Sequence, residues 1–241
     1  MKMPLLPQLD ESNFIELRNL TKTYREAGGE RTVLNHINCQ IRSGELIILL
    51  GKSGSGKSTL LNLISGIDLP TQGEVIIRNQ SLNSLTEQER TLFRRQHIGF
   101  IFQFFNLIPT LTVEENLLLP LELNGQNGRL AQELVMAILE EVGLPDRAKS
   151  YPDRLSGGEQ QRITIARALI HHPDIILADE PTGNLDYETG AQVVAILDQL
   201  VRRQQKTLIM ATHSRELIGI ADRVFSIREG NLVESSALSS Y

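Results

Sequence analysis

Apolar residues along the chain follow two different periods, one typical of strands and one typical of helices. Several short runs are apolar almost throughout, as in strands that are buried on both faces of a parallel sheet. These runs cover residues 45–50, 98–102, 175–179 and 207–211. Residues 14–23 and 33–41 instead alternate apolar and polar side chains, as half-buried antiparallel strands do. A turn at residues 71–73 precedes another predicted strand at 74–78.

Helical periodicity dominates the segment from about residue 86 to 171. Thr112-Val113-Glu114-Glu115 and Ser156-Gly157-Gly158-Glu159 have the pattern of capping boxes, so a helix is expected to begin at each. Residues 129–142 form a predicted amphipathic helix that Gly143 ends. Its expected apolar face consists of Leu130, Leu134, Ala137, Ile138 and Leu139. Further helices are expected from Lys57 onward and at residues 189–204.

Strands and helices alternate on both sides of this helical segment, which is the order of an α/β fold with a mainly parallel sheet. The antiparallel pattern near the N-terminus predicts a β subdomain there, and residues 86–171 predict an inserted α-helical subdomain. A hairpin around Gly230 closes the chain. Because we find neither repeats nor low-complexity linkers, we expect one domain over residues 14–234, with tails at 1–13 and 235–241.

Composition limits the classes of partner. The 24 Lys and Arg against 29 Asp and Glu give a formal charge of −5, which argues against broad affinity for nucleic acid. The single cysteine, Cys39, cannot form an internal disulfide, which fits a reducing cytosol, and we expect it to be buried. The first ten residues lack a signal-peptide pattern, and the longest apolar runs fall short of the roughly 18–20 residues that cross a bilayer. A cytoplasmic chain that reaches a membrane only through a partner is therefore predicted.

A phosphate-binding loop follows the strand at residues 45–50. The segment from Gly51 to Ser58 fits G-x-x-x-x-G-K-[ST] between a strand and a helix, the context that the motif requires. Its glycines let backbone N–H groups approach phosphate oxygens, Lys57 adds a positive charge, and the Ser58 hydroxyl is a ligand for Mg²⁺. The predicted ATP-binding residues here are Gly51, Ser53, Gly54, Ser55, Gly56, Lys57, Ser58 and Thr59. A glycine-rich turn without a ligand is the alternative, and the P-loop NTPase core is the expected fold class.

Two adjacent carboxylates end the strand at residues 175–179. Ligands bind at the carboxyl edge of such sheets, and neighbouring strand residues face opposite ways, so Asp179 and Glu180 are expected to act differently. Asp179 is the predicted Mg²⁺ ligand and Glu180 the predicted general base that polarises the attacking water. A structural pair of acids at a strand end is the alternative.

The segment from Leu155 to Arg162, LSGGEQQR, resembles the LSGGQ-type signature of ATP-binding-cassette (ABC) ATPases. Its serine and two glycines at a helix N-terminus make a second anion site, apart from the phosphate loop. In the family, this site caps the ATP of another molecule, so two nucleotides lie across a dimer. The resemblance covers residues 14–234 and implies an ATPase in which Ser156, Gly157, Gly158 and Gln160 bind the partner's ATP.

Other residues match the family's motifs in order, and the resemblance implies their roles. Tyr24 would stack on adenine, and Gln103 would contact Mg²⁺ and the attacking water. Asp186 belongs to a loop that crosses the dimer interface, and His213 is the histidine that reaches the γ-phosphate. With Glu180 and Lys57, Gln103 and His213 complete the predicted catalytic set. A surface tyrosine, a solvated loop glutamine and a helix N-terminal histidine are the alternatives.

Two segments are similar to the lipoprotein-releasing and macrolide-exporter branch of the family. They are Pro181 to Asp186, with glycine at 183, and Phe102 to Pro109 followed by Leu111 to Asn116. The resemblance implies a homodimer that drives a separate transmembrane permease from the inner face of the membrane, with export or extrusion of lipoprotein, lipid or peptide as the work done. Phe104, Phe105, Leu107 and Ile108 form either a groove for that partner or part of the helical subdomain's own core.

Alternatives remain for the function and for one histidine pair. The same motifs suit an ATPase that signals through a membrane partner without moving cargo. A soluble cassette acting on ribosomes or DNA ends usually has tandem cassettes or a long coiled coil, which this chain lacks, and a small-molecule kinase leaves LSGGEQQR unexplained. His171-His172 has no third metal ligand nearby, so a solvated helix end is expected there.

Overall fold

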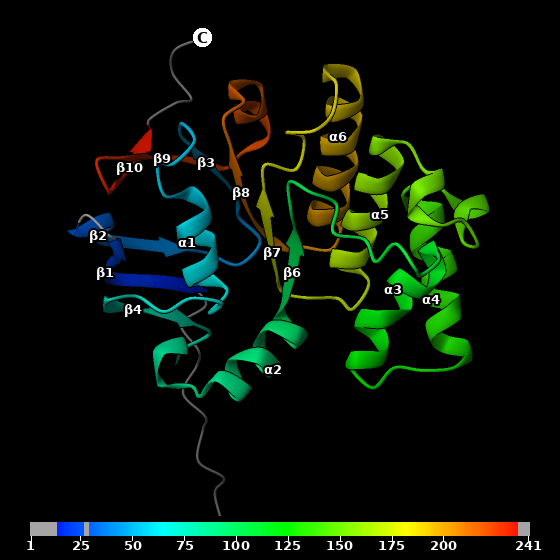
Figure 1. Ribbon diagram of the computed structural model, residues 1–241, viewed down its shortest axis with the longest axis horizontal. Coiled ribbons are helices and arrows are strands. Elements are labelled where there is room, and N and C mark those ends of the chain that lie inside the picture. The colour runs from blue at the N-terminus through cyan, green and yellow to red at the C-terminus, as the bar shows by residue number, and fades with distance from the viewer. Residues whose placement is uncertain (1–13, 27–28, 236–241) are drawn as a thin grey trace, which may run out of the picture.

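The computed structural model describes residues 14–26 and 29–235. The predicted N-terminal tail and residues 236–241 of the C-terminal tail lie outside the described residues. Two sheets and a group of helices follow one another along the longest axis of the molecule, with the antiparallel sheet at one end and helices α3 and α4 at the other (Figure 1).

The first sheet is antiparallel and has the order β2-β1-β4-β5. Its strands are β1 (Ile15–Glu26), β2 (Gly29–Ile41), β4 (Gln72–Ile77) and β5 (Gln80–Ser81). The expected turn at 71–73 is wrong, because β4 already begins at Gln72. Gly73 lies in this strand with a φ of 78°, and a Cβ there would come within 2.3 Å of the Arg18 carbonyl oxygen on β1. Glycine at 73 therefore permits the close pairing of β1 and β4.

The second sheet has the order β10-β9-β3-β8-β7-β6, and every pair except β10–β9 is parallel. Its strands are β3 (Leu46–Leu50), β6 (Ile98–Ile101), β7 (Ile175–Asp179), β8 (Thr207–Thr212), β9 (Arg223–Arg228) and β10 (Asn231–Ser235). The fold class expected from the sequence is confirmed, including the C-terminal hairpin. Strand β6 confirms the strand expected at residues 98–102, and it joins this sheet although it lies within the mostly helical range 86–171.

The helices are α1 (Lys57–Ile64), α2 (Glu87–His97), α3 (Val113–Leu123), α4 (Arg129–Glu141), α5 (Gly157–Leu169) and α6 (Tyr187–Arg203). Four short 3₁₀ segments join them: η1 (Leu82–Ser84), η2 (Pro145–Arg147), η3 (Pro152–Arg154) and η4 (Arg215–Ile220). Both predicted capping boxes are present, at the starts of α3 and α5, and Thr86 with Glu89 forms a third at the start of α2. These caps satisfy backbone N–H groups that a helix leaves unpaired at its start.

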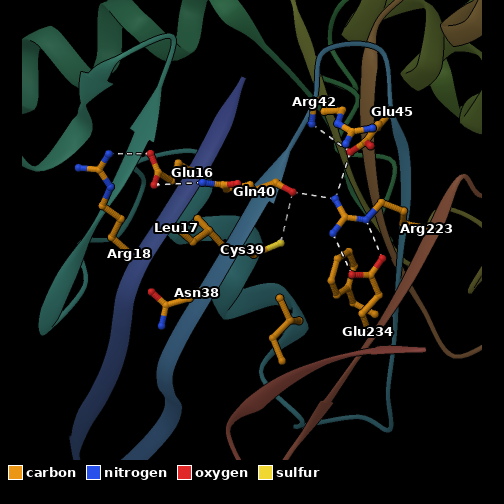
Figure 2. Close-up of a pocket in the computed structure, with 12 residues that line it drawn as sticks. Glu16, Leu17, Arg18, Asn38, Cys39, Gln40, Arg42, Glu45, Arg223 and Glu234 are labelled. Atoms are coloured by element: carbon orange, nitrogen blue, oxygen red, sulfur yellow. Dashed lines mark hydrogen bonds and ion pairs between the residues drawn. The ribbon is translucent and has the colours of Figure 1, made fainter. Parts of the chain in front are cut away.

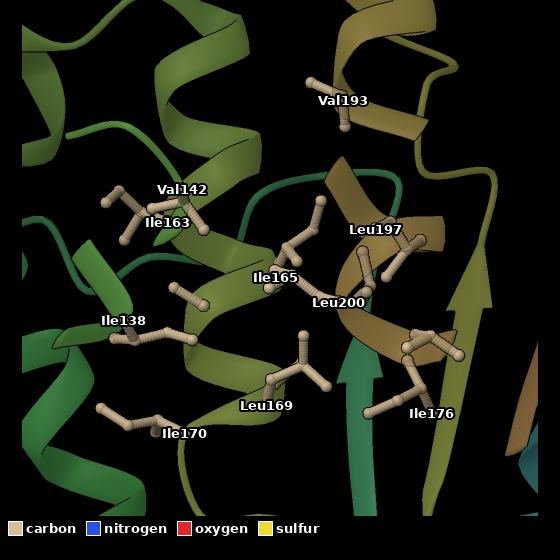
Figure 3. Close-up of a cluster of buried hydrophobic side chains, with 14 of the residues drawn as sticks. Ile138, Val142, Ile163, Ile165, Leu169, Ile170, Ile176, Val193, Leu197 and Leu200 are labelled. Carbon is tan, nitrogen blue, oxygen red and sulfur yellow. The ribbon is translucent and has the colours of Figure 1, made fainter. Parts of the chain in front are cut away.

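Each face of the second sheet is covered by its own apolar core. Ile47 and Ile48, neighbours on β3, belong to different cores because successive strand side chains point to opposite faces. One core lies between this sheet, α1 and the antiparallel sheet. The other holds α3 to α6, and Figure 3 shows its side chains from α4, α5 and α6 meeting beside β7. The two cores fix the position of α1 relative to α5 and α6.

Three local predictions are wrong in whole or in part. On α4, Ile138 and Leu139 of the expected face are buried and Leu134 is half-buried, but Leu130 and Ala137 are exposed, and Ala131 and Val135 are buried in their place. Both stripes have helical spacing, and only the position of α4 against its neighbours selects one of them. Cys39 is half-buried rather than buried. Of the histidine pair, His172 is exposed as expected, whereas both ring nitrogens of His171 are buried. Within the described part of the chain, no helix has the length and apolar character needed to cross a bilayer.

Candidate functional site

The phosphate loop joins β3 to α1 and wraps one end of a cavity of about 780 Å³. Gly54 and Gly56 have φ of 75° and 106°, in the left-handed region that favours glycine. A Cβ at Gly56 would also come within 3.0 Å of the side chains of Val33 and Leu34. Among residues 14–26 and 29–235, no side chain caps the start of α1, so its first backbone N–H groups remain for a ligand. The loop has the geometry of an anion site.

The cavity brings together residues from five segments that are far apart in the sequence. Its lining consists of Tyr24, Arg31, Val33, Lys52, Ser53, Gly54, Ser55, Gly56, Lys57, Ser58, Thr59, Gln103, Asp179, Glu180 and His213. Among the predicted site residues, Gly51, Ser156, Gly157, Gly158, Gln160 and Asp186 are not in this lining. Arg31, Val33 and Lys52 line it without having been predicted. Arg31 lies opposite Tyr24 in the register of β1 and β2, so hairpin pairing was the signal that would have revealed it.

Lys57, Glu180 and His213 form a chain of contacts inside the cavity. The Lys57 Nζ atom lies 3.2 Å from Glu180 Oε1 and donates to the Gly51 carbonyl oxygen at 2.7 Å. His213 Nδ1 lies 2.9 Å from Glu180 Oε2. The Lys57 side chain is only 6% exposed, so the Glu180 carboxylate compensates a buried positive charge. The three residues proposed for chemistry therefore contact one another within the cavity.

Glu180 adopts a left-handed backbone conformation, with φ of 48°. Its N–H donates to the Ala211 carbonyl oxygen at 2.9 Å, which ties the end of β7 to β8. Left-handed backbone is uncommon for a residue with a Cβ and concentrates at functional sites. This conformation turns the Glu180 side chain toward Lys57 and His213.

Asp179 lines the same cavity and is hydrogen-bonded to the Ser58 hydroxyl. Burial raises the pKa of its carboxyl above the usual value, while the Ser58 hydroxyl hydrogen bond and the Lys57 charge oppose that rise. A carboxylate beside a hydroxyl, both lining one cavity, is an oxygen donor set suited to Mg²⁺. Asp179 and Ser58 thus fit the metal that the sequence predicts.

Tyr24 lines the same cavity as these acids. Its hydroxyl donates to Asp68 Oδ2 at 3.0 Å, and Lys22, which is paired with the same carboxylate, lies 4.9 Å from the ring centroid. Burial raises the pKa of the Tyr24 hydroxyl, which therefore stays protonated at neutral pH. These contacts hold an aromatic face at the cavity wall.

Gln103 follows β6 and contacts the loop that precedes α6. Its carbonyl oxygen accepts a hydrogen bond from the Asn184 side chain at 2.8 Å. A Cβ at Gly183 would come within 3.2 Å of Gln103 Nε2, so glycine at this position allows close approach. Gln103 therefore connects the cavity to the 184–186 loop.

The signature segment lies against that same loop and outside the cavity. The Glu159 carboxylate accepts hydrogen bonds from the Ser156 N–H and hydroxyl at 2.8 and 2.9 Å. A Cβ at Gly157 would lie 3.3 Å from Leu185, and one at Gly158 only 2.4 Å from Thr189. Asp186 caps α6 by accepting from the Thr189 N–H at 3.0 Å. Within one chain, the two predicted anion sites are therefore separate.

A second large cleft, of about 810 Å³, lies between the antiparallel sheet and β9–β10 (Figure 2). Five of its six charged side chains form ion pairs within it: Arg223 contacts Glu234 and Glu45 at 2.7 and 3.3 Å, and Arg18 contacts Glu16. Arg42 is the sixth, and its backbone N–H donates to Glu45. Burial raises the pKa of the Cys39 thiol in this cleft to about 11, so it is not a thiolate at neutral pH. The cleft therefore holds the two sheets together through these charged contacts.

Comparison with known proteins agrees with the geometry of the cavity. The sequence profile of the family described as ABC transporter matches residues 34–183. The chain belongs to the ABC transporter ATPase family. An ABC transporter ATP-binding protein of Mycobacterium tuberculosis is 53% identical over 93% of this chain and 91% of its own.

Other members of the ABC family carry more specific names. The lipoprotein-releasing system ATP-binding protein LolD of Psychrobacter arcticus is 43% identical, over 91% of this chain and 98% of its own. The solved structure of an ABC cassette dimer in a post-hydrolysis state, bound to ADP and Pi, is 40% identical with a TM-score of 0.85. The match covers 94% of this chain and 100% of the chain in that structure. The chain is accordingly an ABC ATPase that binds and hydrolyses ATP, and it is the ATP-binding subunit of an ABC transporter.

Proposed function

We propose that two copies of this chain bind two ATP molecules with Mg²⁺ between them and drive a separate transmembrane permease. The separation of the two anion sites carries the proposal: the cavity holds Lys57, Glu180 and His213, whereas Ser156 to Gly158 lie outside it. A head-to-tail pairing of two copies lets the signature of one chain cover the cavity of the other. The dimeric cassette structure to which this chain is similar supports this arrangement.

In the proposed mechanism, the backbone of the phosphate loop and Lys57 bind the phosphates, and Tyr24 stacks on the adenine. The γ-phosphate takes over the role of Glu180 as the partner of Lys57, which leaves Glu180 able to accept a proton from water. His213 orients Glu180 through their 2.9 Å contact. Gln103 contacts the attacking water. Ser58, Asp179 and Gln103 would hold Mg²⁺, which would neutralise charge on the phosphates.

The partner's Ser156, Gly157, Gly158 and Gln160 complete the site, and Asp186 contributes at the interface. Ser156 already presents a helix start with two glycines, where an anion is favoured. Because Glu159 holds the Ser156 N–H and hydroxyl in the single chain, capping an ATP requires these groups to exchange partners.

ATP-dependent dimerisation of a Glu180→Gln variant tests this proposal. We expect a dimer by light scattering with ATP and Mg²⁺, and a monomer without nucleotide. Adding Ser156→Arg should abolish the dimer while ATP still binds, because only the capping site is lost. Adding Thr86→Arg instead removes a similar capping box at the start of α2 and should leave the dimer intact. A Ser156→Arg variant that still dimerises would rule out capping across the interface.

We further propose that the permease contacts the segment after Gln103. The sequence left open whether the four large apolar residues of this segment form a groove or part of a core. In the structure, two of them are exposed and two are half-buried. Phe104 and Ile108 are exposed, Phe104 by 69%, whereas Phe105 and Leu107 are half-buried. Phe105 lies against the start of the signature helix, near Gly157. An exposed pair beside a packed pair suits a surface that transmits force from the partner to α5.

Phe104→Asp is therefore the variant that tests permease coupling. We expect it to keep ATPase activity as an isolated subunit and to lose copurification with the membrane partner. Phe105→Asp should instead destabilise the chain, since its ring packs against the signature helix. Copurification of Phe104→Asp at the wild-type level would place the partner elsewhere.

The LolD relatives support release or extrusion of lipoprotein, lipid or peptide as the work done from the cytoplasmic side of the membrane. An ATPase that signals through its membrane partner without moving cargo has the same site. Cargo movement in vesicles that contain the partner, driven by ATP and abolished by Glu180→Gln, separates the two.

A further inference from the structure

A third cavity, of about 620 Å³, adjoins the phosphate loop. Strands β9 and β10, η4 and the phosphate loop line it, and its polar side chains include Lys52, Ser55, His213, Arg215, Ser226 and Arg228. We call it the cationic cavity. Lys52, Ser55 and His213 line both this cavity and the nucleotide cavity, so the two are adjacent at the end where the phosphates bind.

The charged side chains of this lining are basic. Lys52, Arg215 and Arg228 belong to it, and none of the lining residues is acidic. Across residues 14–26 and 29–235, none of these three side chains forms an ion pair, in contrast to Arg223 in the cleft of Figure 2. The protein as a whole has a charge of −5. Three uncompensated cations around one hollow therefore create a local positive potential that attracts anions.

Two hydroxyl groups in the lining also lack partners. Ser55 Oγ and Ser226 Oγ are both buried and form no hydrogen bond with any described residue. Buried polar groups are nearly always paired, so these two serines keep unused hydrogen-bonding capacity beside the cavity. A hydroxyl can donate to an oxyanion, and an arginine guanidinium can donate two parallel bonds to it. The chemistry of the wall matches a small tetrahedral oxyanion.

We propose that the cationic cavity binds inorganic phosphate and receives the phosphate that hydrolysis releases. The inference rests on the proposed roles of Lys57 and Glu180 in the neighbouring cavity. In hydrolysis, water adds to the γ-phosphorus, the bond to the ADP oxygen breaks, and a proton leaves with phosphate as the second product. The cationic cavity adds no chemical step. It supplies a second position, reached past Lys52, Ser55 and His213, that the cleaved phosphate occupies before it enters solvent.

Binding of labelled inorganic phosphate to the full chain tests the proposal. A non-hydrolysable ATP analogue with Mg²⁺ is bound first, so that the γ-phosphate position is filled and only a different site remains for phosphate. We expect one saturable phosphate site per chain under these conditions. Arg228→Gln and Arg215→Gln should each weaken it by about tenfold, because each loses a charged hydrogen bond to the anion. Arg129→Gln, which removes a 92% exposed arginine on α4, is the control and should leave it unchanged.

The same titration separates the possible failures. If the wild-type chain with the analogue shows no saturable phosphate site, or if both arginine variants bind phosphate as the wild type does, the proposal is overturned. If the analogue itself does not bind, the proposed function fails instead. Ser226→Ala removes one orphaned hydroxyl without changing charge and should weaken phosphate by a smaller factor. If an arginine variant does not fold, phosphate binding by Ser226→Ala still tests the proposal.

Discussion

Replacing Glu180 by glutamine removes one negative charge from a buried contact without changing the size of the side chain. Glu180 is 16% and Lys57 6% exposed, with 3.2 Å between Oε1 and Nζ. Loss of one partner of a buried ion pair costs about 3–5 kcal/mol. The cost is reduced here because the glutamine oxygen still accepts a hydrogen bond and Lys57 keeps the Gly51 carbonyl at 2.7 Å. We expect a loss of about 2 kcal/mol.

The assay is thermal unfolding with and without ATP-Mg²⁺. A loss of about 2 kcal/mol lowers Tm by about 4–8 °C in a chain of this size. ATP restores a negative charge beside Lys57, so the nucleotide should raise Tm more in the variant than in the wild type. Hydrolysis should fall by a factor of about 10²–10⁴, as loss of a general base does.

Glu133→Gln is the matched control, since Glu133 pairs with Arg129 at 2.8 Å but both side chains are exposed, by 58% and 92%. It should change stability by less than about 1 kcal/mol. Two results would refute the reasoning: Glu180→Gln with wild-type Tm in the absence of nucleotide, or Glu180→Gln with wild-type turnover. The first would mean that Lys57 does not depend on Glu180, and the second that Glu180 is not the base.

Three further changes test other parts of the structure. Gly158→Ala places a Cβ 2.4 Å from the Thr189 methyl group and should destabilise the chain by about 1–3 kcal/mol in urea, and adding Thr189→Ala should restore most of the loss. Asn116 is 1% exposed, and its Nδ2 lies within hydrogen-bond distance of three backbone carbonyl oxygens. Asn116→Ala should therefore cost about 2–4 kcal/mol, with Asn124→Ala costing less as a partly exposed control. Burial lowers the pKa of His171 from 6.5 to about 4. The unfolded chain therefore binds a proton that the folded chain excludes, and stability should fall from pH 7 to pH 5 by about 2 kcal/mol; His171→Gln should remove that part of the fall, and an unchanged slope would contradict it.

Much of the site could be predicted from local sequence, because its groups act through their own backbone. The phosphate loop needs left-handed glycines at 54 and 56 and a helix start at Lys57, all fixed by neighbouring residues. The capping boxes at Thr112 and Ser156 are equally local, since each residue bonds one three positions away. Apolar runs of strand length also predicted the buried strands β3, β7 and β8.

Relations between distant segments were not visible in the sequence. Ala131 and Leu130 both fit a helical stripe, and only packing against the neighbouring helices buries one and exposes the other. The same holds for Phe104 and Phe105, which are adjacent in sequence and differ in burial. Arg31 entered the site through its pairing across the β hairpin, and His171 became buried through contacts that its neighbours in sequence do not reveal.

The sequence by itself determined which chemical groups the protein has and the local backbone that presents them, because short-range hydrogen bonds and glycine conformations depend on few residues. The order of strands β3, β8 and β7 decided that Lys57, His213 and Glu180 meet, because parallel neighbours bring their carboxyl ends together at one edge. The same tertiary packing placed the signature helix against Leu185 and Thr189, outside the nucleotide cavity. It also brought Lys52, Arg215 and Arg228 together around the cationic cavity. The positions of these segments relative to one another are set by the packing of both cores, which no single segment encodes.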